Sequence, residues 1–341
     1  MFKKLKEVKI YRKNKTVDMV KRLGVLTANN IRLERYPIKR PVSIFNPSIL
    51  IEDGDVHIYG RMVLGYFTYA SVISEITMPI GDLRELKDSY SAKIEIYPDN
   101  KFDLWGVEDP RIYVMDGKKF ITYCGRTVNY FNQSIWRERT LPVTAVYEDG
   151  RWKKLSVFRM PQEIRGFVIS DKDAFLVKSK NGLKLFHRLH LKDDNYYLVI
   201  SDVQGTLEGN GLKEVEVKNT YLLMEPAEFE EKLGWGTPPI ELEEEYLLLI
   251  HAVDREMKSY KVFAILLNRD LELIAVTPYY IMEPKEIYEI YGDRPYTIFP
   301  CGAQVVDDKL IVSYGAGDIA MAFGEIDLDE LISLLYSNPV G

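Results

Sequence analysis

A unit of roughly 64 residues recurs along the chain and constrains its fold more than any other feature. In each copy a short apolar strand opens at Pro or Ala, a turn follows, and a second apolar strand ends in polar residues. The opening residues, which lie 63, 64, 65 and 64 positions apart, are Pro47, Pro110, Ala174, Pro239 and Ala303. Self-similarity at a fixed period indicates a repeat architecture. A period of this length holds about four strands, so the sequence predicts an all-β, five-bladed β-propeller.

The two ends of the chain fall outside this period. Residues 1–35 are expected to form an N-terminal extension, as an edge strand or an arm, and residues 36–341 to form the propeller. Asp327 and Asp329 precede apolar residues at helical spacing, which predicts a short C-terminal helix over 328–336. Residues 227–233 are predicted to form another short helix. The extension is a candidate for subunit contacts, which leaves a homo-oligomer open.

The composition argues against several kinds of partner. A net charge of −6 and a pI near 5.5 provide no overall positive field, so no nucleic acid is expected. No run of about 18 apolar residues is present, and no apolar stretch follows the basic start, so neither a membrane span nor a signal peptide is expected. Cys124 and Cys301 suit neither a disulfide framework nor a zinc site, and the four histidines form no ligand pair. The sequence therefore predicts a cytoplasmic protein without a metal.

The repetition also predicts where a site would lie. Equivalent positions of each repeat are expected at equal distances from the propeller axis, so polar strand ends should converge at one mouth. The residues that begin the first strands are Asn46, Glu108, Asp109, Asp171, Asp173, Thr237 and Cys301. Those that end the second strands are Arg61, Arg126, His187, Arg188, His251 and Asp318. Asp-Pro and Asn-Pro pairs also simply begin strands. The mixture of carboxylates and cations suits a neutral polyol, or an anion held beside a sugar.

The segments around these positions resemble glycoside hydrolase family 130, the β-mannoside phosphorylases and related mannosidases, over nearly the whole chain. The most specific match is Gly106-Val107-Glu108-Asp109-Pro110-Arg111. Weaker matches, in the order of the family, are Phe45–Pro47, Phe186–Arg188, Lys232–Ile240, His251, Phe299–Gly302 and Tyr314–Asp318. The resemblance implies a five-bladed propeller as catalytic domain, an oligosaccharide substrate, and inverting single displacement at a β-mannosidic bond.

The resemblance also implies roles for single residues. Asp109 is expected to donate the proton, directly or through a sugar hydroxyl. The residues that resemble the family's sugar-binding positions are Asn46, Arg61, Phe299 and Asp318. Those that resemble its phosphate-binding positions are Arg188, Lys232 and His251. Inorganic phosphate is thus the expected co-substrate, and no other cofactor is implied. Glu108 is interpreted as a structural partner of Arg111 or Arg126.

The match departs from the family at one phosphate-side position. Ser170 stands where the phosphorylases have an arginine, eighteen residues before Arg188. Leu189 and Ala252 likewise replace the usual proline and glycine. The cations considered as substitutes for the arginine are Arg165, Lys172 and Lys178.

Three functions therefore stay open. The favoured one is a β-mannoside phosphorylase that releases α-mannose 1-phosphate. The second is an inverting β-mannosidase, which needs a carboxylate base, with Glu225, Glu241 and Glu283 as candidates. The third is a sugar-binding propeller without turnover. Arabinanase-like propellers use three carboxylates, and the context of Asp109 does not favour them.

Overall fold

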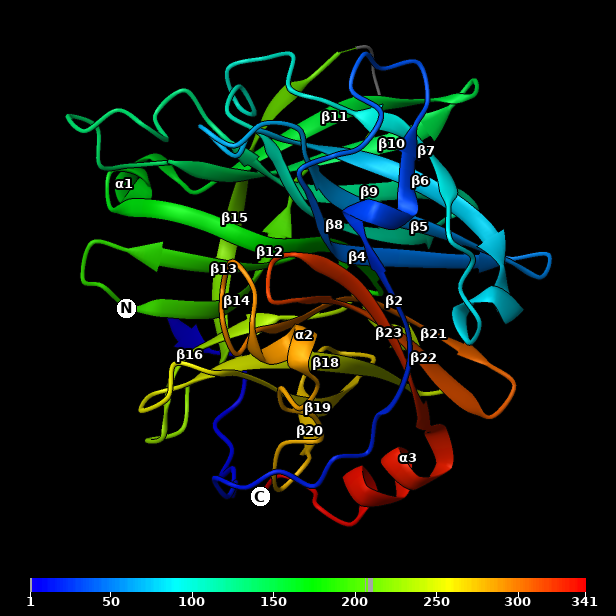
Figure 1. Ribbon diagram of the computed structural model, residues 1–341. Helices are drawn as coiled ribbons and strands as arrows, with labels where there is room; N and C mark the ends of the chain where they lie inside the picture. Colours follow the sequence, from blue (N-terminus) through cyan, green and yellow to red (C-terminus); the bar gives the residue numbers. More distant parts are fainter. Residues whose placement is uncertain (1, 206, 208–210) are drawn as a thin grey trace.

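Strands make up most of the regular structure of the computed structural model, which describes residues 2–205, 207 and 211–341 (Figure 1). Along the chain they form successive antiparallel sets. The first set comprises β4 (Ser43–Glu52), β5 (Asp55–Val63), β6 (Ser71–Pro79) and β7 (Tyr90–Ile96). The second comprises β8 (Val107–Met115), β9 (Lys118–Arg126), β10 (Thr140–Glu148) and β11 (Arg151–Arg159). The third comprises β12 (Val168–Ser179), β13 (Gly182–Leu191), β14 (Tyr196–Val203) and β15 (Lys213–Met224).

Two further sets follow, and β1 and β3 add to the earlier ones. The fourth comprises β16 (Glu230–Trp235), β18 (Glu245–Asp254), β19 (Tyr260–Asn268) and β20 (Leu273–Val276), with β17 (Ile240–Glu241) also paired to β18. The fifth comprises β21 (Ile298–Val306), β22 (Lys309–Ala316), β23 (Ala320–Asp327) and β2 (Lys21–Thr27). Parallel pairing of β10 with β12, and of β11 with β15, joins the second and third sets into one sheet.

The predicted hairpins are present in the described chain. Four of the predicted opening residues lie within β4, β8, β12 and β21, each followed by its antiparallel partner. The fifth, Pro239, directly precedes β17, which pairs with β18. Gly54 and Gly117, at φ of 84° and 72°, occupy turns where a side chain would be strained. The 64-residue period therefore reports a real repetition of antiparallel pairs.

The N-terminal residues are bound to the sheets rather than detached from them. β2 pairs antiparallel with β23, and Figure 1 shows the two side by side. β1 (Lys3–Lys4) adds to β15, and β3 (Ile31–Leu33) adds to β7. Between β1 and β2, the Arg12 side chain donates to Glu230 at 2.6 Å, with exposures of 2% and 0%. β1 and β2 thus complete sheets whose other strands come much later in the chain, whereas β3 joins the set that directly follows it.

One predicted helix is confirmed and the other is wrong. Helix α3 (Leu328–Tyr336) begins at Asp327, whose carboxylate caps the Glu330 N–H, and it buries Leu331 and Leu335. The helix expected over 227–233 is instead a turn followed by β16. Leu233 and Trp235 are buried at the two-residue spacing of a strand, and β16 pairs with β18.

Short helical turns complete the fold. They are α1 (Gln162–Arg165), α2 (Ile287–Ile290) and the 3-10 helices Ala28–Asn30 and Ile80–Leu83. Within the described residues, no helix is long and apolar enough to cross a bilayer.

The buried Arg12–Glu230 pair generates a stability prediction. Arg12→Ala leaves the Glu230 carboxylate buried without its cation, although Tyr280 still donates to it at 2.7 Å. We expect a loss of about 3–5 kcal/mol in the free energy of unfolding, measured by urea denaturation. Arg12→Met combined with Glu230→Gln should lose much less, because no charge stays buried. Lys13→Ala, an exposed neighbour, is the control. A loss below about 1 kcal/mol for Arg12→Ala would contradict this account.

Candidate active site

The first strands of successive sets break their ladders at equivalent positions. The register shifts lie between Phe45 and Ser48 in β4, Glu108 and Arg111 in β8, and Lys172 and Phe175 in β12. Within these breaks, Asn46, Asp109 and Asp173 adopt left-handed conformations with φ of 50°, 51° and 53°. Asn and Asp tolerate this region better than most residues do. The Asn-Pro, Asp-Pro and Asp-Ala openings are therefore the sequence form of a repeated bulge.

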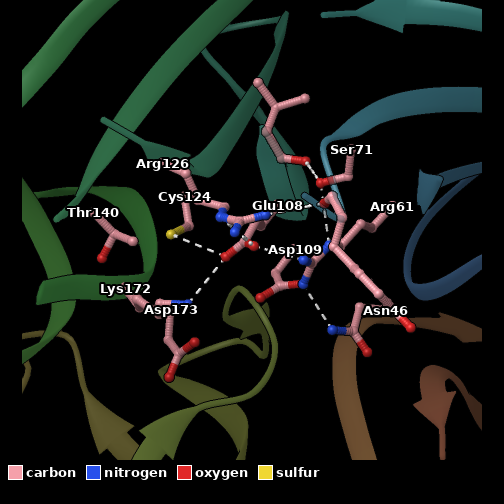
Figure 2. A network of polar contacts seen from close by, with 12 residues as sticks. Asn46, Arg61, Ser71, Glu108, Asp109, Cys124, Arg126, Thr140, Lys172 and Asp173 are labelled. Carbon is pink, nitrogen blue, oxygen red and sulfur yellow. Dashed lines mark hydrogen bonds and ion pairs between the residues drawn. The ribbon is translucent and has the colours of Figure 1, made fainter. Parts of the chain in front are cut away.

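Asp109 lies buried at the centre of a polar network (Figure 2). Asn46 Nδ2 donates to its Oδ1 at 2.7 Å, and Arg61 Nη1 approaches the same oxygen at 3.3 Å. In the described part of the chain, Asp109 Oδ2 has no hydrogen-bond partner. The network thus brings three of the predicted residues together and leaves one carboxylate oxygen available.

Glu108, the neighbour of Asp109, is saturated with cations. Arg61 Nη2 donates to Oε1 at 2.5 Å and Lys172 Nζ to Oε2 at 3.0 Å, while Arg126 Nε lies 3.5 Å from Oε1. Burial would raise the pKa of this carboxyl, but the three cations outweigh it and lower the pKa to about 2. Glu108 is therefore ionised at neutral pH. Its predicted pairing with Arg126 is confirmed.

Arg111 does not pair with Glu108. Its Nε and Nη2 donate to the carbonyls of Gly236 and Trp235 at 2.9 and 2.6 Å, and Nη1 donates to the Asp109 carbonyl at 3.2 Å. Its guanidinium also lies 3.6 Å from the Asp173 carboxylate. Arg111 thus ties the bulge of β8 to β16 and links Asp109 to a second carboxylate.

Asp173 is the centre of a second cluster, and it is not among the binding residues that the family resemblance implies. Arg188 Nε donates to its Oδ2 at 2.6 Å, and His251 Nε2 lies 3.4 Å from the same oxygen. Burial opposes ionisation of Asp173, but Arg188, His251 and Arg111 hold its pKa well below the usual range. The His251 ring packs 4.4 Å from the Phe299 ring. The signal for Asp173 was its place in the repeat, equivalent to Asp109.

Lys232 lies beside this cluster without an anion of its own. Its Nζ is 4.7 Å from the Tyr196 ring, and the Arg188 guanidinium is 5.4 Å from that ring. Among the described residues, no carboxylate forms an ion pair with Lys232. Burial lowers the pKa of Lys232 to about 7, and the Arg188 charge adds to the effect. Arg188 and Lys232 therefore lie against the same Tyr196 ring, and of the two only Arg188 is paired with a carboxylate, Asp173.

Asp318 occupies the turn after β22, also in a left-handed conformation, with φ of 55°. Burial raises the pKa of its carboxyl to about 6, the charge of Asp109 adds to the rise, and Arg61 opposes it. Asp318 thus belongs electrostatically to the Asp109 side of the site.

Two glycines make room for these groups. A Cβ on Gly315 would lie 1.8 Å from Asn46 Oδ1, and one on Gly234 would lie 2.1 Å from His251 Nε2. Both glycines belong to segments that the family resemblance uses, and the reason for them becomes visible only in the packing. They allow side chains from neighbouring sets to meet.

Several buried polar atoms in the site lack hydrogen-bond partners. In the described structure they are Asn46 Oδ1, Arg126 Nε, Asp173 Oδ1 and His251 Nδ1. Such atoms are uncommon in protein interiors, where buried polar groups are normally satisfied. Their convergence here is typical of a site that is completed by a polar ligand.

Other candidates from the sequence lie elsewhere. His187 and Asp171 bind each other at 2.9 Å, and the second ring nitrogen of His187 contacts Ser201. These two residues, predicted among the converging polar strand ends, therefore form a buried pair of their own.

Of the cations considered in place of an arginine at position 170, only one enters the network. Arg165 binds the Met160 carbonyl and Glu216, and Lys178 binds Asp116 on the surface. Lys172 is held by Glu108.

The three carboxylates considered as bases are exposed and paired away from this network. Glu225 pairs with Lys4, and Glu241 lies 3.6 Å from Arg269. Glu283 accepts from Thr16 at 2.8 Å. Their exposures are 64%, 72% and 43%. No group of three or more potential metal ligands occurs within the described residues.

Comparison with known proteins identifies the family. The sequence profile of glycoside hydrolase family 130, described as beta-1,4-mannooligosaccharide phosphorylase, matches residues 10–337. The chain therefore belongs to glycoside hydrolase family 130. It is an enzyme of the class that cleaves β-mannosides by phosphorolysis or hydrolysis, with oligomannosides as the substrate class.

Two curated relatives come from Thermoanaerobacter sp. (strain X514). This chain is 25% identical to a 1,2-beta-oligomannan phosphorylase and 26% identical to a beta-1,2-mannobiose phosphorylase. Each match spans 324 residues, 88% of this chain and 98% of the relative.

Solved structures show the same fold. The β-1,2-mannobiose phosphorylase of Listeria innocua, in complex with β-1,2-mannobiose, superposes with a TM-score of 0.73 at 18% identity, covering 94% of this chain and 99% of that one. A structure from work on family 130 hydrolases that target β-1,2 mannosidic linkages in Candida mannan gives a TM-score of 0.63 at 17% identity, covering 92% and 96%.

The raised pKa of Asp318 generates a pH-dependent stability prediction. The native state favours the protonated carboxyl, so it loses stability relative to the unfolded chain as the pH rises from about 4 through about 6. Asp318→Asn removes this loss. We expect the variant to exceed the wild type by about 1–2 kcal/mol at pH 8, after allowance for partial exposure, and to match it at pH 4.

Urea denaturation at the two pH values measures this difference. Asp307→Asn is the matched control, because Asp307 is exposed and has a similar φ of 54°. An equal effect of Asp318→Asn at both pH values would contradict the assignment.

Proposed function

We propose that this protein is an inverting β-mannoside phosphorylase that releases α-mannose 1-phosphate from β-linked manno-oligosaccharides. The supporting observation is the cluster of cations around Asp173. Arg111 and Arg188 share that one carboxylate, and Lys232 has no ion-pair partner among the described residues. His251 also contacts the carboxylate, but burial lowers the pKa of its ring to about 4, so it is a neutral hydrogen-bonding partner. A phosphate dianion would supply the missing charge, and arginine suits its oxygens through charge-assisted hydrogen bonds.

We propose Asp109 as the proton donor. Its contacts with Asn46 and Arg61 fall on Oδ1, which leaves Oδ2 to carry the proton to the glycosidic oxygen, directly or through a sugar hydroxyl. Glu108 is unsuited to this role because its low pKa keeps it ionised. The two adjacent carboxylates thus differ in the way that acid catalysis requires. Glu108 is fully paired with cations, whereas Asp109 keeps one oxygen free to hold the proton.

The remaining assignments follow from the two clusters. Asn46, Arg61, Phe299 and Asp318 are proposed to hold the mannosyl unit. Arg188, Lys232 and His251 are proposed to hold phosphate on the other side. A phosphate oxygen then attacks the anomeric carbon opposite the leaving oxygen, the glycosidic bond breaks, and the shortened sugar leaves with the proton from Asp109.

We also propose that the five antiparallel sets are the blades of a β-propeller, the fold generally known for the family. The bulges of β4, β8 and β12 support this arrangement, because they bring residues from different sets into one network. The catalytic domain would then comprise residues 36–341 together with β2, which completes the fifth set. Subunit contacts through residues 1–35 and a cytoplasmic location stay predictions.

Hydrolysis is the second candidate, favoured by Ser170 at the position of a family arginine. The test is incubation with β-1,2- and β-1,4-mannobiose, with and without inorganic phosphate. We expect α-mannose 1-phosphate to form only when phosphate is present. Free mannose produced at the same rate without phosphate would instead establish a mannosidase, and binding without turnover would establish a sugar-binding protein. Both linkages are needed, because the family description names β-1,4 and the relatives β-1,2.

Asp109→Asn tests the proton donor. We expect phosphorolysis of mannobiose to fall by about 10²–10⁴-fold, because the amide cannot donate the proton. An aryl β-mannoside with a nitrophenolate leaving group needs little protonation and should lose far less activity. Asp116→Asn, an exposed turn residue with φ of 51°, is the matched control. Equal losses on the two substrates, with unchanged thermal stability, would rule out acid catalysis by Asp109.

A further inference from the structure

Arg294 stands at the edge of the cationic cluster, on the segment between α2 and β21. Its guanidinium lies 4.7 Å from the Tyr260 ring. That ring lies 5.7 Å from the His251 ring and 6.0 Å from the Phe299 ring. Arg294 therefore faces the same aromatic wall as the proposed phosphate site. Nothing in its local sequence marks Arg294 as a site residue.

The backbone around Arg294 is fixed at several points. The Arg294 N–H donates to the Gly317 carbonyl at 3.0 Å, next to Asp318. The Tyr260 N–H donates to the Tyr296 carbonyl at 2.9 Å. Asp293 accepts a hydrogen bond from the Tyr69 hydroxyl at 3.1 Å. The exposed arginine thus projects from a well-supported segment, which lowers the entropy lost when it binds a ligand.

Glu289 anchors the start of the same segment. It is fully buried, accepts from the Tyr314 hydroxyl at 2.7 Å and contacts Arg22 at 3.2 Å. Its carboxylate also accepts the backbone N–H groups of Lys285 and Glu286. The segment is therefore held independently of the Arg294 side chain, so a substitution at Arg294 should not unfold it.

Apart from the Tyr260 ring, the Arg294 side chain has no partner that accounts for its position. Within the described residues it forms no hydrogen bond or ion pair. Burial lowers the pKa of Lys232, and the charges of Arg188 and Arg294 both add to the effect, which means that three cations lie within electrostatic range of one another. Asp173 is already paired with Arg188 and Arg111, so a further anion would relieve the repulsion that Lys232 and Arg294 add.

We propose that Arg294 is a phosphate-binding residue, which closes the anion site opposite Arg188 and Lys232 and thereby helps to select phosphate over water as the nucleophile. This inference rests on the proposed phosphorylase function. The family arginine expected at position 170 is replaced by Ser170 on β12, which pairs with His190 of β13. Under this proposal the third cation of the phosphate site comes instead from Arg294, on the segment before β21. A single phosphate dianion would then contact cations from β13, β16 and the 291–297 segment.

Arg294 has one competing role, as a support for Asp318. It opposes the rise in the pKa of Asp318, and its backbone binds the residue before it. The two roles affect different substrates. Loss of a phosphate contact raises the KM for phosphate, whereas loss of support for Asp318 raises the KM for the mannoside.

The experiment compares Arg294→Gln and Arg294→Lys with the wild type and with Arg151→Gln, an exposed arginine on β11. The KM for phosphate and the KM for mannobiose are measured separately. We expect Arg294→Gln to raise the KM for phosphate by about 10- to 100-fold, as for a lost charge-assisted hydrogen bond, with little change in the KM for mannobiose. Arg294→Lys should recover part of the affinity. The Arg151 variant should behave as wild type.

A binding measurement separates this inference from the function on which it rests. Thermal unfolding is followed while inorganic phosphate is added, without sugar. The wild type should gain stability with phosphate, and Arg294→Gln should need at least about tenfold more phosphate for the same gain. A variant with the wild-type response and KM for phosphate would overturn the role of Arg294 and leave phosphorolysis intact. A wild type that neither uses nor binds phosphate would overturn the proposed function itself.

Discussion

The site depends on a break that recurs in the hydrogen-bond ladders of successive sheets. Where β4, β8 and β12 would continue regularly, Asn46, Asp109 and Asp173 turn into the left-handed region instead. Each break frees backbone groups, and Arg111 satisfies one of them by donating to the Asp109 carbonyl. The positions of the surrounding cations follow from this geometry, because each buried carboxylate at a break needs charge nearby.

Two buried carboxylates of the site, Glu108 and Asp173, serve different purposes. Glu108 is fully compensated by three cations and holds them in place, so it is part of the scaffold. Around Asp173 the balance is reversed, since cations exceed carboxylates and polar atoms lack partners. An enzyme that binds an anion beside a neutral sugar needs both arrangements. The saturated one gives rigidity, and the unsaturated one gives binding energy that is released only when the ligand arrives.

The sequence predicted the hairpin period and the C-terminal helix because both depend on local pattern. It also predicted that Asn46, Arg61 and Asp109 meet, since Asn46 and Asp109 are equivalent positions in a repeat and Arg61 ends the strand paired with that of Asn46. It was wrong at 227–233, where pairing with β18 overrides a weak helical preference. It could not assign Arg111, whose partners are backbone carbonyls of a distant strand. Arg294 reaches the site from outside the repeating strands, so no periodic argument could identify it.

The pairing of β2 with β23 has a consequence for biosynthesis. Lys21 and Glu325 are 304 residues apart in the chain, yet they are neighbours in the sheet. At a translation rate of about 10 residues per second, the early strand waits on the order of half a minute for its partner. During that time its hydrogen-bonding edge is open to other contacts on the ribosome. The turn that carries Asp318 belongs to the same sheet, so the site is completed only when this late closure takes place.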